Sequence, residues 1–164
     1  MSSEQEFITQ VNTNKKIVYK VCNVYMDTKT DRDDLFQEIL LQAWKSYESF
    51  RGDAQFSTWL YRVALNTAIT FLKKDKKKIP TIYNEKLPDI ESLDSNEIEE
   101  KVNAMYKAIG SLNKIDKALV MLYLDDYSYI QIGETLGITA NNVAVKMNRL
   151  KAKLKEDTEK YYQF

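Results

Sequence analysis

Residues 128–154 contain the stretch SYIQIGETLGITANNVAVKMNRLKAKL, which decides the fold of the C-terminal part of the chain. Its pattern predicts a short helix over residues 129–136, followed by a tight turn at Gly137, where the backbone needs a positive φ. Thr139 is suited to cap a second helix, and the small Gly133 allows that helix to approach the first closely. The stretch therefore predicts a helix-turn-helix.

The second of these helices has two chemically different faces. Its apolar residues recur at spacings of four, three and four, so we expect them to be buried. They are Val143, Met147, Leu150 and Leu154. The opposite face suits the major groove of DNA, where Asn can bind adenine and Arg or Lys can bind guanine. An ordinary helical hairpin with a solvated face is the alternative, but the combined offsets favour DNA binding. The residues predicted to contact DNA are Asn141, Asn142, Lys146 and Arg149.

The composition favours helices and excludes several classes of site. The 164 residues include four Gly and two Pro, too few for a turn-rich all-β protein. One Cys and no His exclude an intramolecular disulfide, a Cys/His zinc site and a His-based catalytic triad. No secretory signal is visible, and the longest apolar run, residues 118–124, is too short to cross a membrane. We therefore expect a cytoplasmic protein with no membrane insertion, no cofactor and no metal.

The charges are balanced overall but unevenly distributed. Residues 1–78 carry 13 basic and 10 acidic side chains, residues 79–100 carry one and seven, and residues 101–164 carry 10 and seven. Both prolines fall in the acidic middle segment, which lacks a sustained helical period. We therefore predict an all-α chain of two small helical domains, residues 1–78 and 96–164, joined by a flexible linker over residues 79–95.

The N-terminal domain is predicted to consist of helices. Apolar residues between Phe7 and Tyr25 recur at spacings that mostly fit one helical face. Cys22 lies on this face, so we expect it in the core rather than as a redox sensor. The expected N-caps of the later helices are Asp31, Ser57, Asn113 and Ser128.

Two segments of the chain resemble one protein family. The helix-turn-helix stretch over residues 128–154, together with the preceding SLNKIDKALVMLYLDDYSYIQIGETLGI (residues 111–138), resembles the fourth conserved region of bacterial sigma factors. Residues 31–74, DRDDLFQEILLQAWKSYESFRGDAQFSTWLYRVALNTAITFLKK, resemble the second. Their order, with a short linker and no first or third region, is similar to that of the small extracytoplasmic-function sigma factors. The resemblance implies a non-enzymatic subunit that binds core RNA polymerase and directs promoter-specific transcription initiation, including promoter opening.

The resemblance also implies which residues bind which partner. One helix would dock on the clamp helices of the largest polymerase subunit through Asp34, Leu35, Gln37 and Glu38. The loop FRGDAQF and the helix after it would recognise and open the minus-ten promoter element, which requires aromatic side chains and cations beside unstacked bases. The residues concerned are Phe56, Trp59, Arg62, Asn66, Lys73 and Lys74. The second helix of the helix-turn-helix would bind the minus-thirty-five element as duplex DNA.

Structural alternatives exist for several of these roles. Without the resemblance, Asp34 and Glu38 are explained as solvated charges at a helix start, and Trp59 as a core aromatic residue.

Ala144 stands where family members often have Lys or Arg, a departure that concerns the strength of duplex binding and not the fold. The net charge of zero fits a protein that binds DNA weakly alone and gains affinity within polymerase. An anti-sigma factor is a further expected partner.

The sequence leaves two other functions open. A stand-alone helix-turn-helix regulator with an N-terminal interaction domain would bind duplex DNA tightly without polymerase. An enzyme could hold Mg²⁺ at four carboxylates close together in sequence, although a role in starting a helix is sufficient to explain them. These are Asp31, Asp33, Asp34 and Glu38. The family resemblance implies that the acidic linker passes near the polymerase active-site channel. From its charge we expect it to mimic nucleic acid there until the transcript displaces it.

Overall fold

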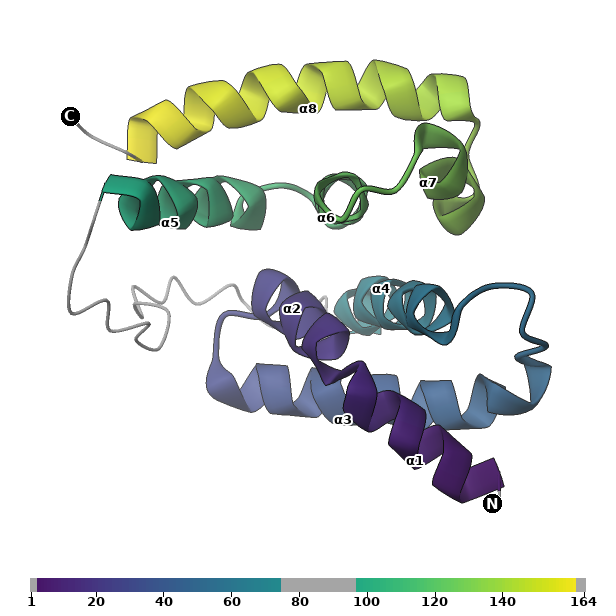
Figure 1. Cartoon of the computed structure of the whole chain (residues 1–164). Helices are drawn as coiled ribbons and strands as arrows, with labels where there is room; N and C mark the ends of the chain where they lie inside the picture. Colours follow the sequence, from purple (N-terminus) through teal and green to yellow (C-terminus); the bar gives the residue numbers. More distant parts are fainter. Residues whose placement is uncertain (1–2, 75–96, 162–164) are drawn as a thin grey trace. The chain divides into compact units, whose positions relative to one another are not determined.

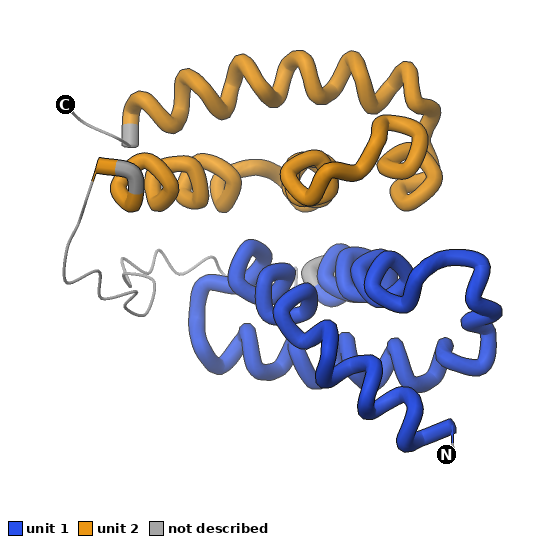
Figure 2. The backbone as a smooth tube through the Cα atoms, viewed as in Figure 1, with its two compact units in different colours: residues 1–85 blue, residues 86–164 orange. Residues whose placement is uncertain are grey.

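The computed structural model describes residues 3–74 and 97–161, and every regular element within these ranges is a helix. The chain divides into two compact units, residues 1–85 and 86–164 (Figure 2). The all-α prediction is therefore confirmed. The predicted linker over residues 79–95 lies outside the described residues.

In the first unit, a short loop separates the last helix from the helices that precede it along the chain (Figure 1). They are α1 (Ser3–Thr13), α2 (Lys15–Tyr25), α3 (Lys29–Ser46), the 3₁₀ helix η1 (Tyr47–Ser49) and α4 (Phe56–Lys74). The apolar face predicted between Phe7 and Tyr25 is divided between α1 and α2. The division occurs at Asn14, whose side-chain amide donates to the carbonyl oxygen of Gln10 at 2.8 Å and so satisfies a carbonyl at the end of α1.

Helices α2, α3 and α4 pack against one another and form the core of the first unit. Burial of one valine, leucine or isoleucine side chain stabilises the fold by about 1.5–3 kcal/mol. Cys22 belongs to the same core at 2% exposure, as the sequence predicted. The largest fully buried side chains of these helices are Val18, Val21, Leu35, Ile39, Leu60 and Leu65.

Helices α3 and α4 begin earlier than the sequence predicted. Thr28, not Asp31, is the N-cap of α3, and its Oγ1 accepts a hydrogen bond from the backbone N–H of Asp31 at 3.1 Å. Helix α4 begins at Phe56, so Ser57 lies within its first turn and is not the cap. Phe56, the first residue of α4, is only 7% exposed and packs into the core. Local capping preference could not reveal this tertiary contact.

The second unit consists of α5 (Glu97–Gly110), α6 (Lys114–Leu124), α7 (Tyr129–Leu136) and α8 (Ala140–Tyr161). The N-terminal part of α8 packs on α7, and its C-terminal part runs along α5 (Figure 1). The predicted N-caps of α6 and α7 are confirmed. Asn113 Oδ1 accepts a hydrogen bond from the Asp116 N–H at 2.9 Å, and Ser128 forms a capping box with Gln131.

The turn between α7 and α8 depends on two glycines. Gly137 has a φ of 74°, in the left-handed region. Gly133 lies against the backbone of the turn, so that a Cβ at this position would be 2.5 Å from the carbonyl oxygen of Ile138. Thr139 Oγ1 accepts a hydrogen bond from the Asn142 N–H at 3.1 Å and so caps α8. The predictions for Gly133, Gly137 and Thr139 are therefore confirmed.

Substitution Gly133→Ala should destabilise the second unit. Alanine favours a helix more than glycine does, but its Cβ would collide with the Ile138 carbonyl, so we expect a net loss of about 1–3 kcal/mol in the free energy of unfolding. Chemical denaturation followed by circular dichroism measures this loss. The control is Gly110→Ala, where an added Cβ meets no atom within 4 Å. Equal stability of Gly133→Ala and wild type would contradict the close contact.

The thiol of Cys22 should be unreactive in the folded protein. Burial raises the pKa of this thiol from 9.0 to about 12, so the reactive thiolate is scarce at neutral pH. We expect an aromatic disulfide reagent to modify Cys22 only as fast as the protein unfolds. Because the unfolded thiol loses its proton first, the free energy of unfolding should fall as the pH rises from about 9 to about 12. Rapid modification at neutral pH, in buffer where circular dichroism reports a folded protein, would refute this.

Candidate nucleic-acid interface

Helix α8 turns its apolar residues inward and its polar residues outward. Val143 and Met147 are 0% and 1% exposed, and Leu150 is also buried. The residues predicted to contact DNA on this helix are all exposed, and they are Asn141, Asn142, Lys146 and Arg149. The helix can therefore present this face to a groove of duplex DNA.

The charges of α8 favour an anionic ligand. Residues 140–155 include five basic side chains and no acidic one. The acidic residues of the helix are confined to its last turns, where Glu156 pairs with Lys160 at 3.6 Å. A run of exposed cations on one helix favours a positive local surface potential, which attracts phosphate groups.

Lys151 differs from the other cations of α8 because it contacts two neighbouring helices. Its Nζ donates a hydrogen bond to Tyr129 Oη at 3.3 Å and lies 4.5 Å from the ring centroid of Tyr123. Hydrogen bonds with Tyr123 and Tyr129 raise the pKa of this amine. Lys151 therefore connects α8 to α6 and α7. Sequence reasoning missed this role, although its position four residues after the buried Met147 indicates an inward direction.

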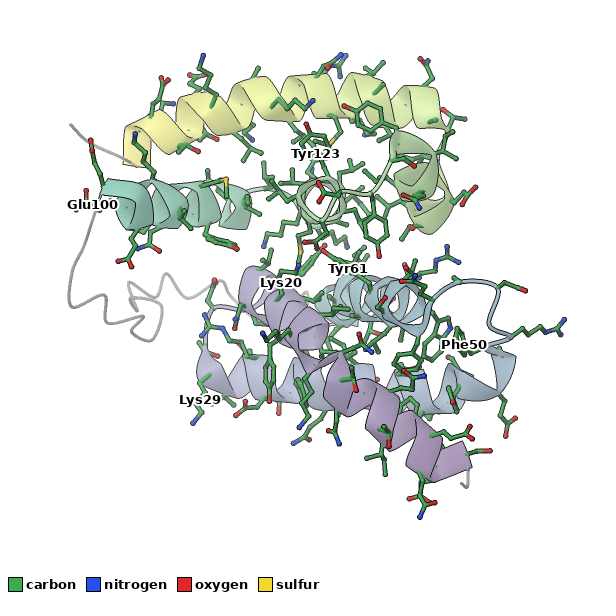
Figure 3. All side chains as sticks on the ribbon, in the orientation of Figure 1. Lys20, Lys29, Phe50, Tyr61, Glu100 and Tyr123 are labelled. Atoms are coloured by element: carbon green, nitrogen blue, oxygen red, sulfur yellow. The ribbon has the colours of Figure 1, made fainter. Side chains whose placement is uncertain are left out.

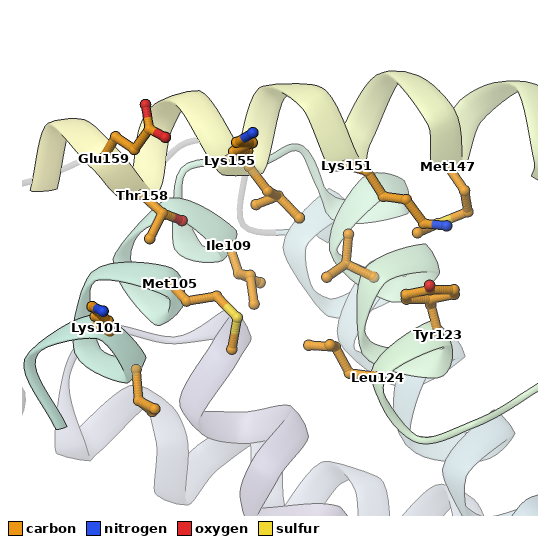
Figure 4. Close-up of a pocket in the computed structure, with 13 residues that line it drawn as sticks. Lys101, Met105, Ile109, Tyr123, Leu124, Met147, Lys151, Lys155, Thr158 and Glu159 are labelled. Carbon is orange, nitrogen blue, oxygen red and sulfur yellow. The ribbon is translucent and has the colours of Figure 1, made fainter. Parts of the chain in front are cut away.

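A groove of about 510 Å³ lies between α5, α6 and α8 (Figure 4). Met105, Ile109 and Leu124 form part of its apolar lining, and Lys151 and Lys155 also line it. Sequence reasoning did not identify this groove, because its lining comes from three helices that are separated along the chain.

In the first unit, aromatic side chains gather around the loop before α4, which carries Phe50 (Figure 3). The ring centroids of Phe50 and Phe56 lie 5.2 Å and 5.4 Å from that of Trp59. Phe7 and Tyr47 add further ring contacts to Phe56. Phe56 is 7% exposed, so most of its ring lies inside the unit, and its contact with DNA stays a prediction. Trp59 is half-buried and keeps an accessible surface.

Asn66 and Arg62 are exposed on α4, as DNA contact requires. Asn66 lines a pocket of about 350 Å³ between α3 and α4. Glu38 and Gln42 of α3 line the same pocket, and Gln42 Nε2 donates a hydrogen bond to Glu38 Oε1 at 2.9 Å. The structure thus brings together Asn66, predicted to contact DNA, and Glu38, predicted to bind polymerase.

The remaining residues predicted to bind polymerase lie on two sides of α3. Asp34 and Gln37 are exposed. Leu35 is 0% exposed and lies in the core of the unit, and its role in polymerase binding stays a prediction. It lies one turn before the buried Ile39, on the stripe that packs against the rest of the unit, and it acts by holding α3 in place.

Three further predictions concern a metal, a membrane and two lysines. Among residues 3–74 and 97–161, no three His, Cys, Asp or Glu side chains are grouped so that they could hold a metal ion, so the alternative magnesium site is not formed there. No helix in the described part of the chain is long and apolar enough to cross a membrane. Lys73 and Lys74, predicted to contact DNA, have side chains outside the described part.

Each of the two units matches a known protein family model. The family model for sigma-70 region 2 matches residues 10–78, and the model for sigma-70 region 4 matches residues 103–154. The chain is 27% identical to the ECF RNA polymerase sigma factor SigW of Bacillus subtilis, over 89% of this chain and 85% of that protein. It is 29% identical to the ECF RNA polymerase sigma-E factor of Escherichia coli K12, over 73% and 69%.

Two solved structures share the fold. One is the sigma factor RpoE in complex with the anti-sigma factor NepR from Bartonella quintana, with a TM-score of 0.68, 17% identity and 94% of each chain covered. The other is CnrH in complex with the cytosolic domain of CnrY, with a TM-score of 0.63, 19% identity, and 94% of this chain and 88% of that chain covered.

The two family matches fall on the two units, in the order that the sequence analysis expected. Together they cover most of the chain, and SigW and the sigma-E factor, which match along its length, are both named as ECF RNA polymerase sigma factors. The chain belongs to the sigma-70 family of bacterial RNA polymerase sigma factors, in its extracytoplasmic-function class.

Proposed function

We propose that this sigma factor binds core RNA polymerase and directs promoter-specific initiation through two DNA-binding surfaces, one in each unit. The observation that carries the proposal is the exposure of a polar face on α8 and of Asn66 on α4, each on a helix whose opposite face is buried. We further propose that the protein has no catalytic activity of its own and acts in the cytoplasm.

The first surface would bind the minus-thirty-five element as duplex DNA. Asn141, Asn142, Lys146 and Arg149 project from the N-terminal half of α8, the part of such a helix that contacts base edges. Arg149 is suited to a bidentate contact with guanine and the two asparagines to adenine. Lys151 is a positioning residue in this account, because its contacts with Tyr123 and Tyr129 hold α8 on α6 and α7.

The second surface would open the minus-ten element. An opened strand offers unstacked bases, which proteins bind with aromatic surfaces, hydrogen bonds to base edges and cations near the phosphates. Trp59, Asn66 and Arg62 supply these three groups along α4, and Lys73 and Lys74 extend the basic charge. The aromatic cluster that includes Phe56 would keep the preceding loop rigid during this contact.

Polymerase docking would use the exposed edge of α3. Asp34 and Gln37 are available there for a partner helix with basic groups. We also propose the domain limits 1–78 and 96–164, with the acidic residues 79–95 between them passing close to the polymerase active-site channel. Since one fold relative was solved in complex with an anti-sigma factor, an anti-sigma factor is a proposed partner here too.

Run-off transcription with core RNA polymerase and a randomised promoter library tests this function. We expect promoter-dependent transcripts only when this protein and core enzyme are both present, because a net charge of zero provides little affinity for DNA alone. Tight and specific duplex binding without polymerase would favour a stand-alone regulator instead. Failure of the purified protein to bind core polymerase would contradict the proposal.

The two-surface proposal predicts separable losses for two variants. Arg149→Ala should reduce transcription by about tenfold or more and remove sensitivity to changes in the minus-thirty-five element. Asn66→Ala should do the same for the minus-ten element, measured on promoters altered in one element at a time. Lys160→Ala, in the last turn of α8, serves as the control. Losses that fall on the same element for both variants would refute the proposal.

A further inference from the structure

We propose that the groove between α5, α6 and α8 is a binding site for a small amphiphile, a single alkyl chain with an anionic head group such as a medium-length fatty carboxylate. The ligand would bind as a free monomer. The four residues of α8 that are proposed to contact DNA do not line this groove, so the site is separate from the proposed DNA surface.

The interior of the groove is apolar and partly exposed to water. Its volume of about 510 Å³ lies within the range of about 300–1,000 Å³ that is usual for small-molecule sites. Met105 and Ile109 of α5 face α8 across the groove, and Leu124 of α6, at its side, is 46% exposed (Figure 4). An alkyl chain would cover these side chains, and each methylene group that it buries raises the affinity by about fourfold. The other apolar lining residues are Val102, Val120, Met147 and Leu154.

The charged side chains at the groove favour an anion. Three lysines line it against one carboxylate, that of Glu159. Lys151 and Lys155 are one turn apart on α8, and Glu159 follows one turn later (Figure 4). A head group beside Lys151 and Lys155 would therefore meet two cations and lie farther from Glu159. The third lysine is Lys101, on α5.

The amine of Lys151 is placed to bind such a head group. Its Nζ lies 3.3 Å from Tyr129 Oη and 4.5 Å from the ring centroid of Tyr123. Both contacts are with neutral groups, and a carboxylate binds an ammonium group more strongly than a hydroxyl does. Because Tyr123 itself lines the groove, the amine already lies at the groove wall. The hydroxyl of Thr158, which also lines the groove, can donate to an anion as well.

The combination of an apolar interior and basic walls selects among classes of small ligand. A sugar or a nucleotide would place hydroxyl and amino groups against apolar side chains, where they lose hydrogen bonds to water. A cationic amphiphile would be repelled by the lysines, and a neutral hydrocarbon would gain nothing from them. An alkyl chain with a negative charge at one end satisfies both features.

Isothermal titration calorimetry of the full chain with decanoate, below its critical micelle concentration and at neutral pH, tests the proposal. We expect decanoate to bind about a hundredfold more tightly than hexanoate, because its longer chain buries more methylene groups. Decyltrimethylammonium has a tail of the same length and a positive head group, so it should bind about tenfold more weakly than decanoate or less. Circular dichroism checks that the protein stays folded at each ligand concentration.

The methyl signals of methionine in NMR spectra locate the bound ligand. Met105 and Met147 line the groove, whereas Met26 is buried in the first unit. We expect decanoate to shift the signals of Met105 and Met147 and to leave the signal of Met26 unchanged. A shift of Met26 as large as that of Met105 would indicate unspecific binding and would overturn the proposal.

One pair of variants tests the role of the basic wall. Lys155→Met removes a cation from the groove but keeps a long side chain, so it should weaken decanoate binding by about fivefold to tenfold. Lys107→Met removes an equal charge from an exposed position on α5 that does not line the groove, and it should bind decanoate as wild type does. Circular dichroism confirms that both variants are folded before their affinities are compared.

These measurements use the protein without polymerase, so their outcome is independent of the sigma-factor function. The proposal is overturned if decanoate does not bind, or if hexanoate or decyltrimethylammonium binds as tightly as decanoate. It is also overturned if Lys155→Met keeps the wild-type affinity for decanoate. In the first case the groove would be left to a helix of a partner protein, which is a different occupant from the one proposed.

Discussion

Burial of one apolar stripe on each long helix is the constraint on which both proposed DNA surfaces depend. In α8, Val143 and Met147 are sealed inside, and the side chains of Lys146 and Arg149 are therefore left outside. A shift of one residue would rotate the helix by about 100° and remove this arrangement. In α3, burial of Leu35 and Ile39 has the same effect: it leaves Asp34 and Gln37 exposed and directs Glu38 and Gln42 to the pocket beside α4.

Two contacts fix the position of α8 against its neighbours. Just before α8 begins, the turn lies so close to Gly133 that a Cβ there would collide with the carbonyl oxygen of Ile138. Further along α8, Lys151 contacts Tyr129 and Tyr123, which lie on α7 and α6. A helix held at both points loses little conformational freedom on binding DNA, and less of the binding free energy is then lost to ordering it.

Helix α3 presents different side chains on different sides. Asp34 and Gln37 are exposed, whereas Glu38 and Gln42 line a pocket that α4 completes with Asn66. Ring contacts among Phe50, Phe56 and Trp59 lie beside the loop that leads into α4.

Local patterns predicted much of this architecture. The periodicity of α8, the turn at Gly137 and the caps at Asn113, Ser128 and Thr139 are visible in the sequence, because each depends on residues within one or two turns of each other. The starts of α3 and α4 were predicted wrongly: Thr28 caps α3, and α4 begins at the buried Phe56. Those two helices carry the residues for which single-residue roles are hardest to assign from sequence.

By itself, the amino-acid sequence determined that the chain is helical, that it has two units, and which face of α8 is exposed, since helical periodicity and short-range capping record these properties directly. Only the tertiary structure decided that Phe56 belongs to the core, that Lys151 contacts two tyrosines, and that Glu38 shares a pocket with Asn66. The physical reason is that these contacts join side chains on different helices. No local spacing encodes which helices meet or at what depth a side chain comes to lie.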